Sequence, residues 1–136
     1  MLYGEVLIPQ AVYIEFLATA RATRQAVLAT APWIRVTALA RPQRARVYVG
    51  LDAGEAEVLA LAEERAARLV IIDELRGRRY ARRLGLPLTG TLGILLLAKE
   101  RALIAAVSPL LDTLLDEGLY LAPELVHKVR ELAGEL

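Results

Sequence analysis

The sequence predicts an α/β protein with a largely parallel sheet. Short apolar and β-branched runs alternate along the chain with stretches whose apolar residues recur at helical spacing. The clearest strand, Leu69 to Ile72, is continuously apolar, which is typical of a strand that is buried on both faces. It leads directly into Asp73, and ligands of open α/β sheets bind at the carboxyl ends of strands. Asp73 is therefore the first candidate for a functional residue.

Each element is predicted from a local signal. Pro9 favours the start of a helix after the first strand, and the second helix must end before Pro32. Ser108 is expected to cap a helix, and Gly85 and Gly118 to end one. The predicted strands are residues 5–8, 33–37, 69–72 and 86–88, and residues 47–49 receive no firm assignment. The predicted helices are residues 10–20, 22–29, 55–68, 75–84, 91–100, 108–118 and a last one from residue 123.

Composition predicts a single domain over residues 1–136. The chain is 56% hydrophobic and long enough to bury a core. Its formal net charge of +1 gives no overall attraction to nucleic acid or to a membrane. It has no cysteine, which excludes disulfides and thiolate catalysis and fits a reducing compartment. Because neither a secretory signal nor a membrane-spanning run is recognisable, we expect a cytoplasmic protein without a membrane partner.

Three carboxylates lie beside apolar or small residues and are the candidate catalytic and metal-binding groups. They are Glu15 on the first helix, Glu55 at the start of the third, and Asp73. Carboxylates gathered in one cleft repel one another, and Mg²⁺ or Mn²⁺ relieves that repulsion through oxygen ligands. Such an ion would stabilise charge on a phosphoryl oxygen, so the set predicts phosphodiester hydrolysis.

Each carboxylate also has a purely structural interpretation. Glu15 could face solvent, Glu55 could complement the dipole of its helix, and Asp73 could cap the helix that follows it. The functional interpretation requires that the three converge in the fold.

A basic helix after Asp73 is the candidate contact for nucleic acid. Guanidinium groups hold phosphates, so a basic face beside a metal cleft suits a nuclease. The alternative is a solvated surface helix whose arginines pair with glutamates. The candidate nucleic-acid-binding residues are Arg76, Arg78, Arg79 and Arg82, within a cluster that also contains Arg83, together with Thr91.

Two further features carry less information. Thr91 lies in Gly-Thr-Leu-Gly, where it could cap the next helix or hydrogen-bond to a site aspartate, but no lysine follows as in a P-loop. His127, the only histidine, has no motif around it and is expected to face solvent. Ser-His or Cys-His catalysis therefore has no support.

The run from Asp73 to Gly93, with its Asp-Glu-x-x-Gly-Arg-Arg and Gly-Thr-Leu-Gly elements, resembles the signature region of a prokaryotic subfamily of PIN-domain proteins. The resemblance extends to residues 6–15, 51–57 and 132–135. It implies a three-layer α/β/α sandwich with a mostly parallel sheet. It also implies an acidic cluster that binds Mg²⁺ or Mn²⁺ for single-stranded RNA cleavage, and a role as the toxin of a toxin–antitoxin pair.

By motif position, Glu15, Glu55 and Asp73 match the acids of that family, with Glu57 the alternative to Glu55. Family members normally begin with a further strand that ends in an aspartate, before the Gly-Glu-Val-x-Ile-Pro segment that here starts at Gly4. We therefore expect an N-terminal truncation that impairs activity. Either the start codon was assigned late, or the sheet closes differently, or a second protomer covers the gap that the missing strand leaves. The last of these predicts a homo-oligomer.

The first hypothesis is a metal-dependent single-stranded RNA endonuclease of the toxin–antitoxin type, with an antitoxin protein as a partner. The second is a non-catalytic PIN-like domain that binds nucleic acid or protein. The third is a module whose apolar C-terminal helices form the interface with an antitoxin.

Overall fold

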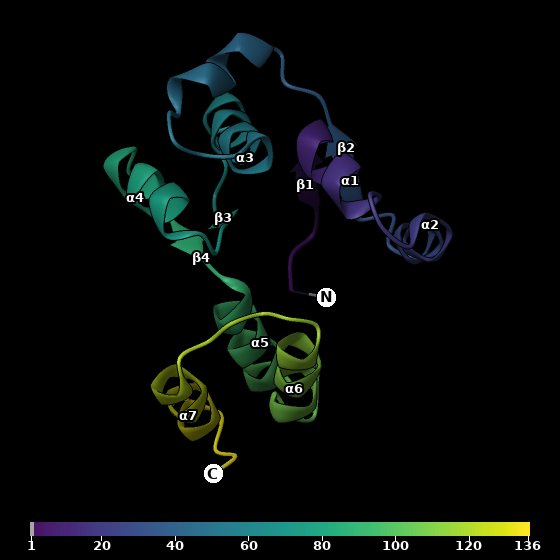
Figure 1. Cartoon of the computed structure of the whole chain (residues 1–136), viewed down its shortest axis with the longest axis vertical. Helices are drawn as coiled ribbons and strands as arrows, with labels where there is room; N and C mark the ends of the chain where they lie inside the picture. The colour runs from purple at the N-terminus through teal and green to yellow at the C-terminus, as the bar shows by residue number, and fades with distance from the viewer. Residues whose placement is uncertain (1) are drawn as a thin grey trace. The chain divides into compact units, whose positions relative to one another are not determined.

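The computed structural model describes residues 2–136, which form two compact units, each with its own hydrophobic cluster. The N-terminal unit is Tyr3–Thr89, and the C-terminal unit is Gly90–Leu136 together with Leu2. Helices and short parallel strand pairs are both present, as labelled in Figure 1. This confirms the predicted α/β class.

Two pairs of parallel strands form the sheets of the N-terminal unit. Strand β1 (Val6–Pro9) pairs with β2 (Ile34–Thr37), and β3 (Val70–Ile71) pairs with β4 (Leu88–Thr89). The Ile72 N–H donates to the Thr89 carbonyl at 2.9 Å, so the second pairing continues one residue beyond β3. The predicted parallel pairing is therefore present, although the second pair of strands is very short.

The helices of this unit surround a small core. The core contains Leu59 and Ala60 of α3, Val70 and Ile72 of the β3 segment, and Ala81 of α4. All five residues are buried. The helices are α1 (Gln10–Phe16), α2 (Arg21–Ala29), α3 (Ala53–Glu64) and α4 (Leu75–Arg83). The first helix ends earlier than predicted, and the chain reaches a left-handed conformation at Ala20 before α2 begins.

Residues 47–49, which the sequence left without a firm assignment, form no strand. Pro42–Val47 instead forms the 3₁₀-helix η1, and the Tyr48 N–H donates to the Ala45 carbonyl. The Tyr48 side chain is buried, and its hydroxyl donates to the Glu63 carboxylate on α3. Packing of this tyrosine into the core outweighs the β propensity of its valine neighbours.

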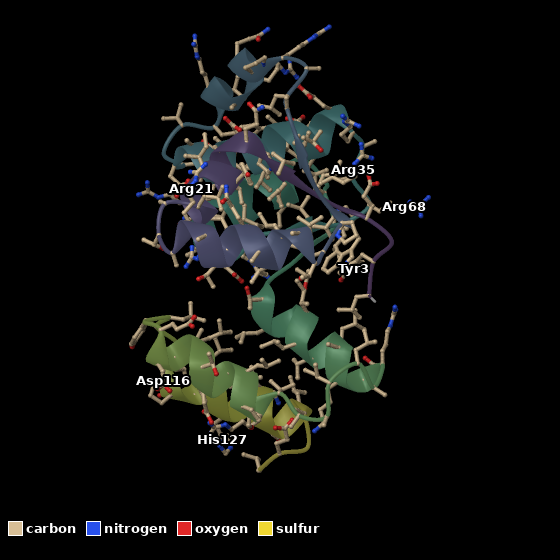
Figure 2. The ribbon with its side chains drawn as sticks, turned by 90° about the vertical axis from the view of Figure 1, so that its right-hand side faces the viewer. Tyr3, Arg21, Arg35, Arg68, Asp116 and His127 are labelled. Atoms are coloured by element: carbon tan, nitrogen blue, oxygen red, sulfur yellow. The ribbon has the colours of Figure 1, made fainter. Side chains whose placement is uncertain are left out.

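The C-terminal unit contains α5 (Thr91–Glu100), α6 (Ser108–Asp116) and α7 (Pro123–Leu132), which bury Val107, Leu111 and Val129. Ser108 is the first residue of α6 rather than its cap. The Glu135 carboxylate accepts from the Val107 and Ser108 N–H groups at 2.8 and 2.9 Å, which satisfies the start of this helix. Figure 2 shows His127 at the surface of α7, and it is exposed as predicted.

Among the helices of residues 2–136, none has both the length and the apolar character that are needed to cross a bilayer.

Candidate functional site

Glu15 lies where α1 packs on α3. A Cβ atom added at Gly54 would lie 3.0 Å from Glu15 Oε2 and 2.7 Å from Oε1, and the second distance is shorter than real Cβ atoms show. The glycine is buried, whereas Glu15 is exposed. Because Gly54 has no side chain, there is room beside it for the Glu15 carboxylate. Gly54 directly precedes Glu55 in the sequence.

Glu57 has a structural role in the same helix contact. Its Oε1 accepts from the N–H of Ala11, in the first turn of α1, at 3.0 Å. N–H groups in the first turn of a helix have no partner within the helix, so this carboxylate stabilises the start of α1. Of the two neighbouring glutamates, Glu57 is thus engaged by the backbone of another helix.

Glu55 occupies the first turn of α3 and is half-buried. Burial, and then the negative charges of Asp52 and Glu74, together raise the pKa of its carboxyl from 4.5 to about 7. Asp52 caps the helix by accepting from the Glu55 N–H at 2.9 Å. Three carboxylates from two parts of the chain therefore interact around the N-terminus of α3.

Asp73 lies between Ile72 and the start of α4, where it is exposed. The N-cap of α4 is Glu74, whose carboxylate accepts from the Gly77 N–H at 2.8 Å. The interpretation of Asp73 as this cap is therefore wrong. Gly77 explains the glycine of the Asp-Glu-x-x-Gly motif, because a Cβ atom there would lie 2.3 Å from Ile72 Cδ1.

The structure brings Glu55 close enough to Asp52 and Glu74 for their charges to interact. It also places the Glu15 carboxylate beside Gly54, which directly precedes Glu55. Within residues 2–136, however, no three Asp, Glu or His side chains are grouped so that they could hold one metal ion. The donor set fits Mg²⁺ or Mn²⁺ by its chemistry, since all its ligands are carboxylate oxygens. The pKa of Glu55 is raised first by burial and then by the negative charges of Asp52 and Glu74, and a divalent cation would relieve the second of these effects.

Asp52 and Glu74 are the acids that sequence reasoning missed as site residues. Each is an N-cap, and each stands in an acidic pair of the sequence, Asp52 three residues before Glu55 and Glu74 directly after Asp73. The cap preference of acidic residues could have identified both, because two helix N-termini that meet would bring their caps together.

A basic groove lies along one face of α4. It is lined by Val49, Arg76, Arg79, Tyr80 and Arg83, and we refer to it as the arginine groove. The helical spacing of the last four residues places them on one side of the helix. Within residues 2–136, no glutamate forms an ion pair with an arginine of α4. The structure therefore does not show the alternative arrangement, in which the arginines of α4 form ion pairs with glutamates.

Hydrogen bonds fix one wall of the arginine groove. The Tyr80 hydroxyl donates to the Val49 carbonyl at 2.8 Å, and Arg76 Nη1 donates to the Gly50 carbonyl at 3.2 Å. The Arg83 guanidinium lies 5.8 Å from the centroid of the Tyr80 ring. The loop before α3 is therefore attached to the helix that carries the arginines.

The remaining predicted binding residues lie elsewhere. Arg78 and Arg82 belong to α4 but do not line the groove. Thr91 is the first residue of α5, whose N-cap is Gly90, so Thr91 belongs to the C-terminal unit. Sequence reasoning did not single out Val49 or Tyr80 as groove residues, although the helical spacing of Tyr80 between the arginines could have identified it.

Comparison with known proteins agrees with the resemblance in the sequence. No curated protein and no solved structure gave a match. A family model described as a PIN domain matches residues 1–135 and so extends over both compact units. The chain belongs to the PIN-domain family.

Proposed function

We propose that this chain is a metal-dependent single-stranded RNA endonuclease of the toxin–antitoxin type. PIN domains are in general nuclease-type domains that bind nucleic acid and use divalent metals, and the family match covers nearly the whole chain. The observation that carries the proposal is the group of carboxylates around the N-terminus of α3, where burial and like charge raise the pKa of Glu55 to about 7.

In this proposal, Glu55, Asp73 and Glu15 hold Mg²⁺ or Mn²⁺ through carboxylate oxygens. The bound cation supplies positive charge beside the scissile phosphate. Glu55 is preferred to Glu57 because Glu57 already accepts from the backbone of α1. Gly54 allows the Glu15 carboxylate to lie against α3. Cleavage adds one water across a P–O bond, which leaves a phosphate on one fragment and a hydroxyl on the other.

A second candidate function is a PIN-like domain that binds nucleic acid or protein without cleaving it. The observation that favours it is that no three potential ligands are grouped for one metal ion within residues 2–136. In this case the arginine groove retains its role, and the carboxylates serve only as helix caps and packing groups.

We include two protein partners in the proposal. In the C-terminal unit, apolar side chains such as Leu110, Tyr120 and Leu132 are exposed, which suits an interface with an antitoxin. In the N-terminal unit, each sheet described has two strands, so every strand has an edge without a strand partner within its sheet. Such edges favour association, and a homo-oligomer would cover them.

The test is cleavage of single-stranded RNA with Mn²⁺ or Mg²⁺ by the wild type, Glu55→Gln and Asp73→Asn, with Glu57→Gln as the matched control. We expect metal-dependent cleavage that the first two variants lose and the control keeps. Absence of cleavage by a folded wild type that still binds RNA would favour the second candidate. Equal cleavage by wild type and variants would remove these residues from the site.

A further inference from the structure

We propose that the arginine groove holds the phosphates of single-stranded RNA beside the scissile position, and that the strand passes over Val49 toward Asp52 and Glu57 on α3. This rests on the proposed function for the identity of the substrate. The inference goes beyond the proposed function because it assigns a separate binding site, with its own residues, and a direction for the RNA strand.

The first argument is the charge of the groove. Arg76, Arg79 and Arg83 line it together, and no glutamate among residues 2–136 forms an ion pair with any of them. Successive residues on this face are about 5–6 Å apart between their Cβ atoms. A regular row of guanidinium groups suits a polymer that carries one negative charge at each nucleotide, since Arg binds phosphate through paired N–H groups.

The second argument is that the groove is held in place by its own hydrogen bonds. The Tyr80 hydroxyl and Arg76 bind the carbonyls of Val49 and Gly50, and the Tyr48 ring packs edge-on against Tyr80 at 5.4 Å between centroids. The wall that faces the arginines therefore needs little ordering when a ligand binds, which lowers the entropic cost of association.

The third argument concerns single strands. Val49 lines the groove but is 77% exposed, an apolar side chain among cationic ones. Bases and riboses are accessible in a single strand and largely covered in a duplex, so an apolar contact next to phosphate-binding groups favours the single strand.

The fourth argument gives the direction. A second hollow shares Val49 with the arginine groove and continues along Gly50 and Leu51 to Asp52, Ala53 and Glu57. Asp52 and Glu57 flank Glu55, which lies in the first turn of α3. A strand that follows the two hollows is thus held by arginines at one end and reaches the acidic end of α3 at the other.

The experiment measures binding without catalysis. A 5′-labelled oligouridylate is titrated by fluorescence anisotropy in EDTA at several salt concentrations. The groove variant is Arg79→Gln with Arg83→Gln, and the matched control is Arg21→Gln with Arg68→Gln, which removes equal charge from exposed positions outside the groove (Figure 2). Arg79→Gln alone is included because Arg79 lines the groove at an exposed position.

We expect the groove variant to bind at least about tenfold more weakly and the control to stay within about twofold of the wild type. For a single strand, each lost phosphate contact lowers the slope of log K against log salt by about 0.7, so the groove variant should lose about 1.4. Val49→Ser should weaken binding without changing the slope, because it removes an apolar contact and no charge.

Three results would overturn the inference: equal losses in both double variants, tighter binding of duplex RNA than of the oligouridylate, or equally effective competition by polyglutamate, which would indicate an acidic protein segment. The proposed function is tested separately. If RNA binds in the groove but is never cleaved with metal, the nuclease proposal fails and the groove stands. If the groove variant cleaves with unchanged kcat/KM, the groove fails and the nuclease stands.

Discussion

The carboxylate of Glu15 lies beside the position that a Cβ atom of residue 54 would take, and Gly54 is in the turn of α3 that also carries Glu55. Gly54→Ala would place a methyl group 2.7 Å from Glu15 Oε1, and the flexible glutamate would move away. Alanine is also the better helix former by about 1 kcal/mol, so we expect stability to be kept within that amount. Metal-dependent cleavage should fall roughly 10- to 100-fold, because a displaced ligand spoils the geometry of the site.

The control for this prediction is Glu15→Gln. If Gly54 acts only by positioning Glu15, the protein that carries both Gly54→Ala and Glu15→Gln should cleave no worse than Glu15→Gln alone. The two changes then affect one contact. Unchanged cleavage by Gly54→Ala, with denaturation curves that show a folded protein, would mean that Glu15 does not act in the site.

Glu57→Ala should separate the structural glutamate from the catalytic one. It removes the acceptor of the Ala11 N–H, so we expect a loss of about 1 kcal/mol in the free energy of unfolding. Cleavage per folded molecule should change little, because Glu55 supplies the proposed metal ligand. Urea denaturation together with cleavage assays measures both quantities. A stable Glu57→Ala protein that no longer cleaves would exchange the roles of the two residues.

Glu55→Gln should change the pH dependence of stability. The pKa of Glu55 in the folded protein is about 7, raised by burial and then by Asp52 and Glu74, against 4.5 for the ordinary group. The folded state therefore binds more protons than the unfolded state between these values, so ionised Glu55 removes stability as the pH rises from 4.5 through 7. Near pH 8 the glutamine variant should be more stable, by about 1 kcal/mol after allowance for solvent screening.

Near pH 4 the same two proteins should have equal stability, because Glu55 is then protonated in both the folded and the unfolded state. Glu117→Gln, at an exposed position after α6, serves as the control and should show no such trend. A constant difference between wild type and Glu55→Gln across this pH range would contradict the acidic cluster.

Local signals in the sequence predicted the parts of the fold that depend on a single segment. The apolar run before Asp73, the prolines at positions 9 and 123 and the glycine at position 118 all mark element ends that the structure has. Residues 47–49 could not be assigned from the sequence because burial of Tyr48 against α3 is a tertiary effect that β propensity does not contain.

The candidate site depends more on tertiary contacts. Sequence position alone suggested Glu55 and Asp73, but it gave no sign that Glu57 binds the Ala11 N–H, and it did not decide between Asp73 and Glu74 as the cap of α4. These roles arise where two helices meet, and residues far apart in sequence decide them. The assignment of Glu15, Glu55 and Asp73 to a metal site stays a prediction.

Gly77→Ala should destabilise the N-terminal unit. The added methyl group would lie 2.3 Å from Cδ1 of Ile72, which is buried and cannot move into solvent. We expect a loss of about 1–3 kcal/mol from overpacking, which outweighs the gain in helix propensity. Urea denaturation measures the change, with Gly93→Ala on the exposed side of α5 as the control. Unaltered stability would mean that α4 can move away from the β3 segment without cost.

Glu135→Gln should loosen the C-terminal unit in a pH-dependent way. The Lys99 ammonium, and then the N–H groups of Val107 and Ser108, lower the pKa of Glu135 from 4.5 to about 2. Because the folded state favours the ionised form of Glu135, this carboxylate stabilises the folded state above pH 4.5. The stabilisation is lost as the pH falls from 4.5 to 2. Near pH 7 the variant should therefore melt at a lower temperature than the wild type. Near pH 2 the two should melt together.

Amide hydrogen exchange would locate this effect. In the variant, the Val107 and Ser108 amides should exchange faster than in the wild type, since the carboxylate that accepts from them is lost. The control is Glu131→Gln, which breaks only an exposed pair with Lys128 at 3.5 Å and should leave both amides protected. Equal exchange in both variants would show that α6 starts without help from Glu135. Faster exchange confined to Glu135→Gln would show that this carboxylate holds the end of the chain to the start of α6.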